Sequence, residues 1–421
     1  MASIVAAAKQ LLFKLRDKGV LYWVTASIVL FVAFTGSGYV YGYFHLINLR
    51  SQFFQELVEL APRPVEPGFV KIVLIDDDEY WKGYLAGRRP IKRDYLARLV
   101  NFLVEANANV IGLDFDTRLP DPQSMDIPAD YRVETEVLTK AIENAAQQGK
   151  KIVLSTPISY DNEQRYRRDP DIYQAHQLCK DDVSVRPIGG IASSGSSVPN
   201  IACGYIARPY DPLVIPGPLL MADGGYLDSF ALALSRASNP DLVSHFLERV
   251  GNDVRYGNYM SEEKFREYGA LFSASAVLQG AVNKQKFAAS TVVIGAHWSR
   301  DAAGRGPRID IHWTPVGWIS GAVLHANFAE AFLDRRAIAA TPDWAVRGTE
   351  LLFALVAAVL FASVPSFWGK VGGLVGLVLF LFLVQWSALN FLGVFFDSLV
   401  PVLGLAIHSL SERLLGGHGT G

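Results

Sequence analysis

Acidic side chains follow two short apolar segments of the sequence, at positions where they could bind a cation. Residues 76–79 read Asp-Asp-Asp-Glu directly after VKIVLI, and Asp114 and Asp116 end the segment NVIGLDFD. If both segments are strands of one parallel sheet, their carboxyl ends share an edge, where open α/β sheets bind ligands. Carboxylate oxygens there would suit Ca²⁺, Mg²⁺ or a cationic group. The alternative is that these acids cap helices and accept backbone hydrogen bonds in turns.

Imidazole and carboxylate groups also gather in the last third of the chain. They are His297, Asp301, Asp310, His312 and His325, and their spacing does not match HExxH. In an extended strand, Asp310 and His312 would project from the same face. These residues are candidates for a metal or catalytic site, with helix capping and structural hydrogen bonding as the alternative.

Together the two groups predict one ligand crevice outside the carboxyl ends of the strands. It is expected to be bordered by Asp77, Asp114 and the turn around His297. The sequence has no GxSxG, no P-loop and no glycine-rich dinucleotide motif after a strand. No catalytic residue and no cofactor is therefore predicted, and metal binding by the acids is left open.

The elements that would position these side chains alternate between strand and helix. Short β-branched runs buried on both faces are typical of parallel sheets, and four such runs occur, at residues 70–75, 109–115, 151–155 and 291–295. Apolar and small residues at helical spacing predict four helices, at residues 90–106, 134–148, 229–235 and 322–333. This order predicts an α/β domain with a mostly parallel sheet and right-handed crossovers.

Composition divides the chain into membrane and exported parts. Of the 421 residues, 50% are hydrophobic and 19% are charged, and the formal net charge is −2. Because there is no basic surplus, nucleic-acid binding through phosphate neutralisation is excluded. Long uncharged runs predict four transmembrane helices, at residues 19–46, 349–368, 371–390 and 398–415. A cleaved signal peptide is the alternative for the first run, which is longer than such peptides usually are.

The charges beside these runs predict the orientation. Lysines and arginines are frequent in residues 1–18, and cationic flanks stay in the cytoplasm. Residues 1–18, a turn at Lys370 and the tail 416–421 are therefore expected in the cytoplasm. Residues 47–348 are expected on the outer side of a bacterial inner membrane.

The two cysteines, Cys179 and Cys203, both fall in the part that is predicted to be exported. Exported thiols that are close in sequence usually pair in an oxidising compartment. A disulfide between them is therefore predicted. Two separate buried thiols and a metal-binding pair are the alternatives.

Gly372 and Gly376 lie four residues apart near the start of the third predicted span. Small residues at this spacing let membrane helices approach each other closely. The two glycines are therefore predicted to pack helices, either within the predicted four-helix bundle or against another protein chain.

The exported part resembles the CHASE type 2 domain, an extracellular sensory module associated with cyclases and histidine kinases. The similarity follows several blocks in order: VKIVLIDDDEYWKGYLAGRRPIKRDYLARLVNFL, NVIGLDFDTRLPDP, VETEVLTKAIENAAQQGKKIVLS, DGGYLDSFALALSRA, and a closing block with Ile294-Gly295, Thr314-Pro315 and Gly-x-x-x-His-Ala-Asn at residues 321–327. One span before the domain and three after it match the family layout. The resemblance implies an α/β sensory domain of unspecified ligand and supplies no catalytic residues.

Three functions follow from these expectations. Family members commonly continue into a cytoplasmic cyclase, kinase or phosphatase, whereas residues 416–421 alone follow the last predicted span. A stand-alone sensor would bind its ligand outside and signal through its helices to a separate membrane or cytoplasmic effector. An accessory subunit would use the sensory fold as a scaffold in a larger membrane complex. A membrane-anchored metal-dependent hydrolase is the third reading, but the chain is not expected to be an enzyme. Membrane lipid is a partner in each case, and each allows a homo-oligomer.

Overall fold

The computed structural model describes fifteen parts of the chain, residues 47–60, 66–116, 128–156, 158–160, 166–168, 199–206, 214–220, 226–250, 255–256, 258–304, 306–334, 338–340, 342–364, 366–392 and 394–395. The chain divides into two compact units, one formed by Pro62–Ala337 and the other by Met1–Ala61 with Ile338–Gly421. The larger unit holds the main sheet, and the smaller unit holds the long apolar helices.

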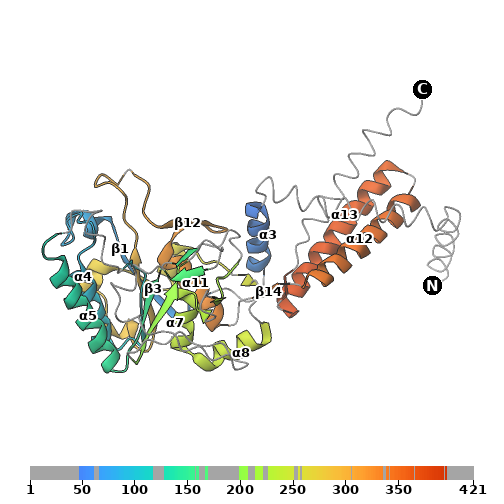
Figure 1. Cartoon of the computed structure of the whole chain (residues 1–421). Helices are drawn as coiled ribbons and strands as arrows, with labels where there is room; N and C mark the ends of the chain where they lie inside the picture. Colours follow the sequence, from blue (N-terminus) through green and yellow to red (C-terminus); the bar gives the residue numbers. More distant parts are fainter. Residues whose placement is uncertain are drawn as a thin grey trace. The chain divides into compact units, whose positions relative to one another are not determined.

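The larger unit is built on a six-stranded sheet in which all neighbouring strands are parallel (Figure 1). In spatial order the strands are β10 (Leu271–Ser273), β1 (Val70–Ile75), β11 (Thr291–Ala296), β2 (Val110–Leu113), β3 (Lys151–Thr156) and β6 (Ile201–Tyr205). Strand β11, the last of the six in sequence, lies between β1 and β2, where Val293 is paired with Ile72 on one side and Gly112 on the other. The predicted α/β fold with a mostly parallel sheet is confirmed.

Helices cover both faces of this sheet. One face packs against α4 (Arg93–Glu105), α5 (Tyr131–Gln147) and α10 (Ala274–Leu278), and the other against α7 (Phe230–Ser238), α8 (Pro240–Val250), α9 (Glu262–Glu267) and α11 (Gly321–Leu333). Successive strand residues point to opposite faces. In β1, Val73 and Ile75 belong to the core that contains α4, whereas Ile72 and Leu74 belong to the core that contains α11. Burial on both faces explains why these strands are apolar at nearly every position.

Helix α11 is buried at every position, so its sequence has no polar face. It approaches the sheet closely because Gly295, at the end of β11, has no side chain. A Cβ at Gly295 would overlap that of Ala322, and a Cβ at Gly321 would overlap the carboxylate of Asp310. The glycines of the closing sequence block therefore set how closely the first turn of α11 approaches its neighbours.

Shorter elements complete the larger unit. A π-helical turn, η1 (Asp78–Lys82), follows β1, and a 3-10 turn, η3 (Lys284–Phe287), precedes β11. An antiparallel hairpin of β12 (Ile311–Thr314) and β13 (Gly317–Ser320) comes directly before α11. The remaining strands are β4 (Ile158–Tyr160), β5 (Tyr166–Arg168), β7 (Leu219–Leu220), β8 (Tyr226–Leu227) and β9 (Arg255–Tyr256).

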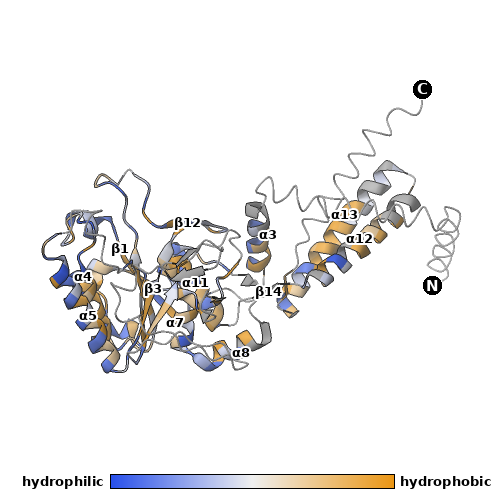
Figure 2. Ribbon diagram, viewed as in Figure 1, coloured by the Kyte–Doolittle hydropathy of each residue, from blue (hydrophilic) through white to orange (hydrophobic). Residues whose placement is uncertain are grey.

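The smaller unit contains long apolar helices, which Figure 2 colours as hydrophobic along much of their length. Its elements are α3 (Ile47–Glu59), β14 (Ile338–Ala340), α12 (Asp343–Ser363), α13 (Phe367–Ser387), a π-helical turn η4 (Ala388–Leu392) and β15 (Val394–Phe395). Among the described residues, one helical segment, Gly372–Phe391, is long and apolar enough to cross a membrane. It coincides with the predicted span 371–390 to within one residue at each end.

The predicted helix 349–368 differs from the structure. Helix α12 begins at Asp343 and ends at Ser363, and Lys370, predicted in a turn, lies within α13. The reason is a helix cap: the hydroxyl of Ser366 accepts a hydrogen bond from the Gly369 N–H at 3.1 Å and starts a new helix. The predicted spans 19–46 and 398–415 and both predicted cytoplasmic ends lie outside the described residues, so the number of spans stays a prediction.

The larger compact unit covers Pro62–Ala337, and the limits 47–348 of the exported domain stay a prediction. Helix α3 belongs to the smaller unit, where Phe54 packs edge-on against Phe395 with ring centroids 4.8 Å apart. The buried residues of α3 include Phe54, Leu57 and Val58.

Candidate functional site

A cavity of about 490 Å³ lies at the carboxyl edge of the sheet. Three strands contribute residues at or just after their ends, namely Ala296 from β11, Asp114 from β2 and Ile206 from β6. Leu324 from the first turn of α11 and His312 from β12 line the cavity as well. A crevice was predicted at this edge of the sheet, and the carboxyl ends of the strands do line a cavity there.

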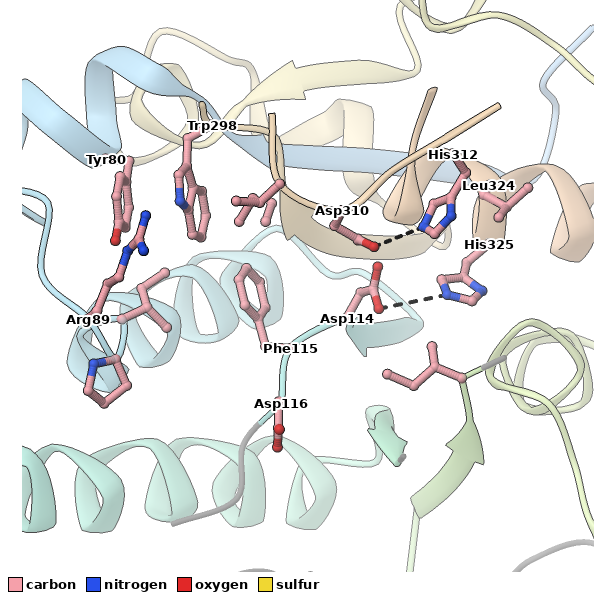
Figure 3. Close-up of a pocket in the computed structure, with 15 residues that line it drawn as sticks. Tyr80, Arg89, Asp114, Phe115, Asp116, Trp298, Asp310, His312, Leu324 and His325 are labelled. Atoms are coloured by element: carbon pink, nitrogen blue, oxygen red, sulfur yellow. Dashed lines mark hydrogen bonds and ion pairs between the residues drawn. The ribbon is translucent and has the colours of Figure 1, made fainter. Parts of the chain in front are cut away.

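One end of the cavity is walled by aromatic rings (Figure 3). Tyr80, in the turn after β1, stacks on Trp298 with ring centroids 4.1 Å apart and planes inclined by 6°. Phe115 lies 6.5 Å from Trp298 at an angle of 16°. The guanidinium of Arg89, which also lies at this end, donates to the carbonyl oxygen of Arg300 at 3.1 Å. This end therefore offers a flat apolar wall with a cation beside it.

The other end of the cavity holds two carboxylates and two imidazoles (Figure 3). Asp310 Oδ1 lies 2.9 Å from His312 Nε2. Asp310 precedes β12 and has a positive φ of 50°, so this contact does not come from two positions of one extended strand, as the sequence had predicted. Asp114 Oδ1 lies 3.8 Å from His325 Nε2, which is longer than a hydrogen bond. The side chains of Asp114 and His325 are 5% and 9% exposed. Asp114 Oδ2 has no hydrogen-bond partner among the described residues.

Burial controls the protonation of these groups. It raises the pKa of Asp114 well above the usual value, and the negative charge of Asp310 raises it further. Burial also lowers the pKa of His325 to about 4. His325 is therefore neutral near pH 7 and brings no positive charge to Asp114.

Asp77 was predicted to border the same crevice, but it is not among the residues that line the cavity. Its carboxylate accepts hydrogen bonds from the backbone N–H of Ser299 at 2.6 Å and from the Ser299 hydroxyl at 2.5 Å. Burial acts to raise the pKa of Asp77, but these hydrogen bonds outweigh it and keep the pKa below the usual value. Asp77 thus fixes the loop after β11. This agrees with the alternative interpretation of the acidic run, in which the acids accept backbone hydrogen bonds in turns.

His297, the third predicted border residue, also lies outside the cavity lining. Its Nδ1 is 3.4 Å from Glu262 Oε1, and its Nε2 contacts the guanidinium of Arg308. Glu262 in turn accepts a hydrogen bond from the backbone N–H of Ser320 at 2.9 Å. Burial lowers the pKa of His297, although Glu262 opposes the shift. These contacts join the loop after β11 to α9 and β13.

The other acids after β1 also make structural hydrogen bonds. Asp76 accepts from the backbone N–H of Glu79 at 3.1 Å and from the hydroxyl of Ser273 at 2.7 Å, so it joins the ends of β1 and β10. Within the described ranges, no group of three or more His, Cys, Asp or Glu side chains is arranged to hold a metal ion.

Sequence reasoning missed an ion-pair network that fixes the loop carrying Arg89. Arg88 donates to both carboxylate oxygens of Glu134, at 2.6 and 3.0 Å, and Glu134 Oε2 also accepts from the Arg93 N–H at 3.1 Å. The Arg88 and Glu134 side chains are 14% and 10% exposed. The arginines before α4 were a visible signal, but their partner is 46 residues away and no spacing rule identifies it.

Cys203 is buried in β6 and is disulfide-bonded. Its predicted partner, Cys179, lies outside the described residues. The pairing of Cys179 with Cys203 therefore stays a prediction.

Gly372 and Gly376 occupy exposed positions of α13. A Cβ added at either glycine meets nothing within 4 Å. Among the described residues, this face of α13 therefore has room for another helix.

Comparison with known families supports the resemblance seen in the sequence. The family model of the CHASE2 domain matches residues 25–364, a range that contains the main sheet with its helices as well as α3 and α12. No curated protein and no solved structure matches the chain. The resemblance is thus confirmed over most of the chain.

Proposed function

Since the chain belongs to the CHASE2 domain family, we propose that it is a membrane-anchored extracytoplasmic sensor. In this proposal the domain binds a small molecule in the cavity at the carboxyl edge of the sheet, and the event passes through the membrane helices to a separate protein. The observation that carries the proposal is the position of α11, whose first turns line the cavity through Leu324 and His325. The proposal assigns the chain no catalytic activity.

The far end of α11 is tied to the start of the domain. The buried carboxylate of Glu330 accepts hydrogen bonds from the N–H groups of Phe69 at 2.7 Å and Val70 at 2.6 Å. Glu330 follows His325 by about 7.5 Å along the helix axis. In sequence, α11 is followed by α12, which begins at Asp343. A displacement of α11 would therefore act on both chain segments that leave the domain.

Such a displacement would be transmitted because α11 is packed on all sides. Asn327 accepts a hydrogen bond from the Met260 N–H at 2.6 Å and donates to the Met260 carbonyl oxygen at 3.0 Å. Packed elements switch between discrete arrangements more readily than they deform. The whole helix is therefore expected to respond as one body when the cavity is filled.

Native mass spectrometry of the full chain, purified from its membrane, tests the cavity. Wild type is expected to carry a small molecule that denaturation releases. Ile309→Trp enlarges a half-buried residue of the lining and is expected to abolish this binding. Val133→Trp adds the same ring at a position of α5 that is 61% exposed, and it should retain the molecule. A molecule retained by Ile309→Trp, or none in wild type, would contradict the proposal.

For the membrane topology, the proposal places residues 1–18 and 416–421 in the cytoplasm and the domain outside. It is supported by the apolar helical segment Gly372–Phe391 and by the cationic residues before the first predicted span. A reporter fused after Glu163 is expected to behave as exported, and one fused after Leu415 as cytoplasmic. An exported signal after Leu415 would exclude an even number of crossings.

A second candidate function, an accessory subunit of a larger membrane complex, is favoured by the open face of α13. Gly372 and Gly376 share this face with Leu379 and Leu383, which are both 58% exposed. The double substitution Gly372→Leu and Gly376→Leu is expected to weaken association with a second copy or a partner. Gly348→Leu, on an equally open position of α12, is the matched control.

Co-purification separates the two functions. A stoichiometric kinase or cyclase would favour the sensor, and a large permanent assembly would favour the accessory subunit. If the doubly substituted protein keeps the same partners as wild type, the open face of α13 is not the interface.

A further inference from the structure

We infer that the cavity binds an organic cation, a primary amine on an aromatic or aliphatic body, with Asp114 as its counter-ion. The inference rests on the proposed function, because it names the ligand class of the same cavity. The acidic end would hold the ammonium group, and the aromatic end would receive the body of the molecule.

The charged groups around the cavity are unbalanced. Asp114 and Asp310 are the carboxylates of the acidic end, and Arg89 is the one guanidinium or ammonium group among the described lining residues. Figure 3 shows Arg89 at the aromatic end, away from Asp114. The imidazole nearest to Asp114 belongs to His325, and it is neutral near pH 7 because it is buried. Among the described lining residues, the acidic end therefore holds no guanidinium or ammonium group, and its other imidazole, that of His312, lies beside Asp310.

Asp114 is the side chain that most needs a cationic partner. It is 5% exposed, and its Oδ2 has no hydrogen-bond partner among the described residues. Burial favours the protonated form of this carboxyl group, and a cation bound beside it would favour the ionised form. Figure 3 shows the carboxylate directed into the cavity toward Asp310 and His312. A ligand ammonium there would supply both the missing hydrogen-bond donor and the missing charge.

Other ligand classes fit this end less well. An anion would face Asp114 and Asp310 together, and a neutral molecule would gain nothing from the charge of Asp114, because burial favours the protonated form of this side chain. A metal ion would need more ligands than the described residues bring together. The stacked rings of Tyr80 and Trp298, with Phe115 beside them, suit the apolar body of an organic molecule. An organic amine satisfies both ends of the cavity.

Three compounds of similar shape test the charge requirement. Tryptamine carries an ammonium group, tryptophol a hydroxyl and indole-3-propionate a carboxylate on the same indole ring. Isothermal calorimetry on the full chain in lipid nanodiscs is expected to show binding of tryptamine, about 30-fold or more weaker binding of tryptophol, and no binding of indole-3-propionate. An alkyl ammonium stays charged below about pH 10, so the comparison can be made over a wide pH range.

Asp114→Asn removes the charge with almost no change in shape. It is expected to weaken tryptamine binding by about 30-fold or more. Asp78→Asn is the matched control, because it removes a carboxylate that is 79% exposed and pairs with Lys82 outside the cavity. Thermal unfolding of both variants shows whether each is folded.

Wild type provides a readout that does not depend on a substitution. The titratable groups near Asp114 are Asp310, His312 and His325, and protonation of any of the four would disfavour a bound cation. The affinity for tryptamine is therefore expected to rise with pH. Calorimetry in two buffers of different ionisation enthalpy is expected to show proton release on binding in mildly acidic solution.

The outcomes separate this inference from the proposed function. If tryptophol or indole-3-propionate binds as tightly as tryptamine, or if folded Asp114→Asn binds tryptamine like wild type, the cationic ligand class is wrong while the cavity remains a binding site. If none of the three compounds binds, the inference is overturned. The proposed function would then fail as well if Ile309→Trp also leaves the co-purified molecule in place.

Discussion

Replacing Glu330 by alanine removes the acceptor that joins the end of α11 to the start of β1. Glu330 and Val70 are fully buried, so water cannot easily take the place of the carboxylate. A hydrogen bond to a charged group contributes about 1.5–3 kcal/mol, and leaving a buried donor unsatisfied costs about as much. With two N–H groups bound, Glu330→Ala is expected to lower the free energy of unfolding by about 4 kcal/mol. Glu330→Gln keeps a carbonyl oxygen but loses the charge, so a loss of about 2 kcal/mol is expected.

Two measurements on the full chain test this expectation. Denaturant unfolding gives the change in stability, and hydrogen exchange reports on the amides of Phe69 and Val70, which should lose protection in Glu330→Ala. Glu136→Ala, at an exposed position of α5, should change neither quantity. A loss below about 1 kcal/mol with unchanged protection at both amides would refute the role of Glu330 as the joint between α11 and β1.

Further predictions concern buried charges and close packing. Burial lowers the pKa of His325 from 6.5 to about 4, so folding favours the neutral imidazole. The resulting contribution to the free energy of unfolding, about 3 kcal/mol, is present above pH 6.5 and is lost as the pH falls to 4. Between pH 7 and pH 4, the free energy of unfolding of wild type should therefore fall by that amount more than the free energy of unfolding of His325→Gln. Asp114, whose pKa shift acts in the opposite direction, is present in both proteins and does not affect this comparison. Arg236→Met leaves Asp228 buried without its partner at 2.6 Å and should cost about 3–5 kcal/mol at pH 7; because burial already raises the pKa of Asp228 to about 6, the loss measured at pH 5 should be smaller. Gly295→Val would force α11 away from the sheet, and a loss of about 1–3 kcal/mol or more in thermal unfolding is expected.

The strands that sequence predicted well are those buried on both faces. Strands β1, β3 and β11 lie within one residue of the predicted ranges at each end, because burial on two faces leaves an uninterrupted apolar run. Their order in the sheet was not predictable in the same way. The placement of β11 between β1 and β2 depends on pairing with residues far away in sequence, which no local pattern records.

Two strands of the sheet were missed for different physical reasons. Strand β10 has three residues, Leu271–Ser273, which is too short for a periodic signal. Strand β6 reads IACGY, and its glycine weakens a strand pattern. Here the glycine is required by packing, because a Cβ at Gly204 would lie 2.5 Å from the Phe230 Cα.

The candidate site shows what residue type and position can predict. Asp114 was identified because an acid at the carboxyl end of a buried strand lies where such sheets form their crevice. Asp77 met the same criterion, yet it turns toward Ser299 and holds a loop. Consecutive residues after a strand point in different directions, and the sequence does not say which one faces the cavity. The aromatic wall of the cavity was not predicted, because Tyr80 and Trp298 come from two loops that lie together only in the folded structure.

A ligand can shift α11 from one position to another only to the extent that the protein binds the ligand more tightly when α11 is in the second position. Asp114 follows β2 in the sheet, whereas His325 belongs to α11, so the 3.8 Å between Asp114 Oδ1 and His325 Nε2 spans the boundary between sheet and helix. An ammonium group bound to Asp114 would alter the contacts across this boundary. Coupling energies between sites are typically about 1–3 kcal/mol, which is less than the roughly 4 kcal/mol expected for the two hydrogen bonds of Glu330. The joint at Glu330 would therefore hold while α11 moves, and the start of β1 would move with it.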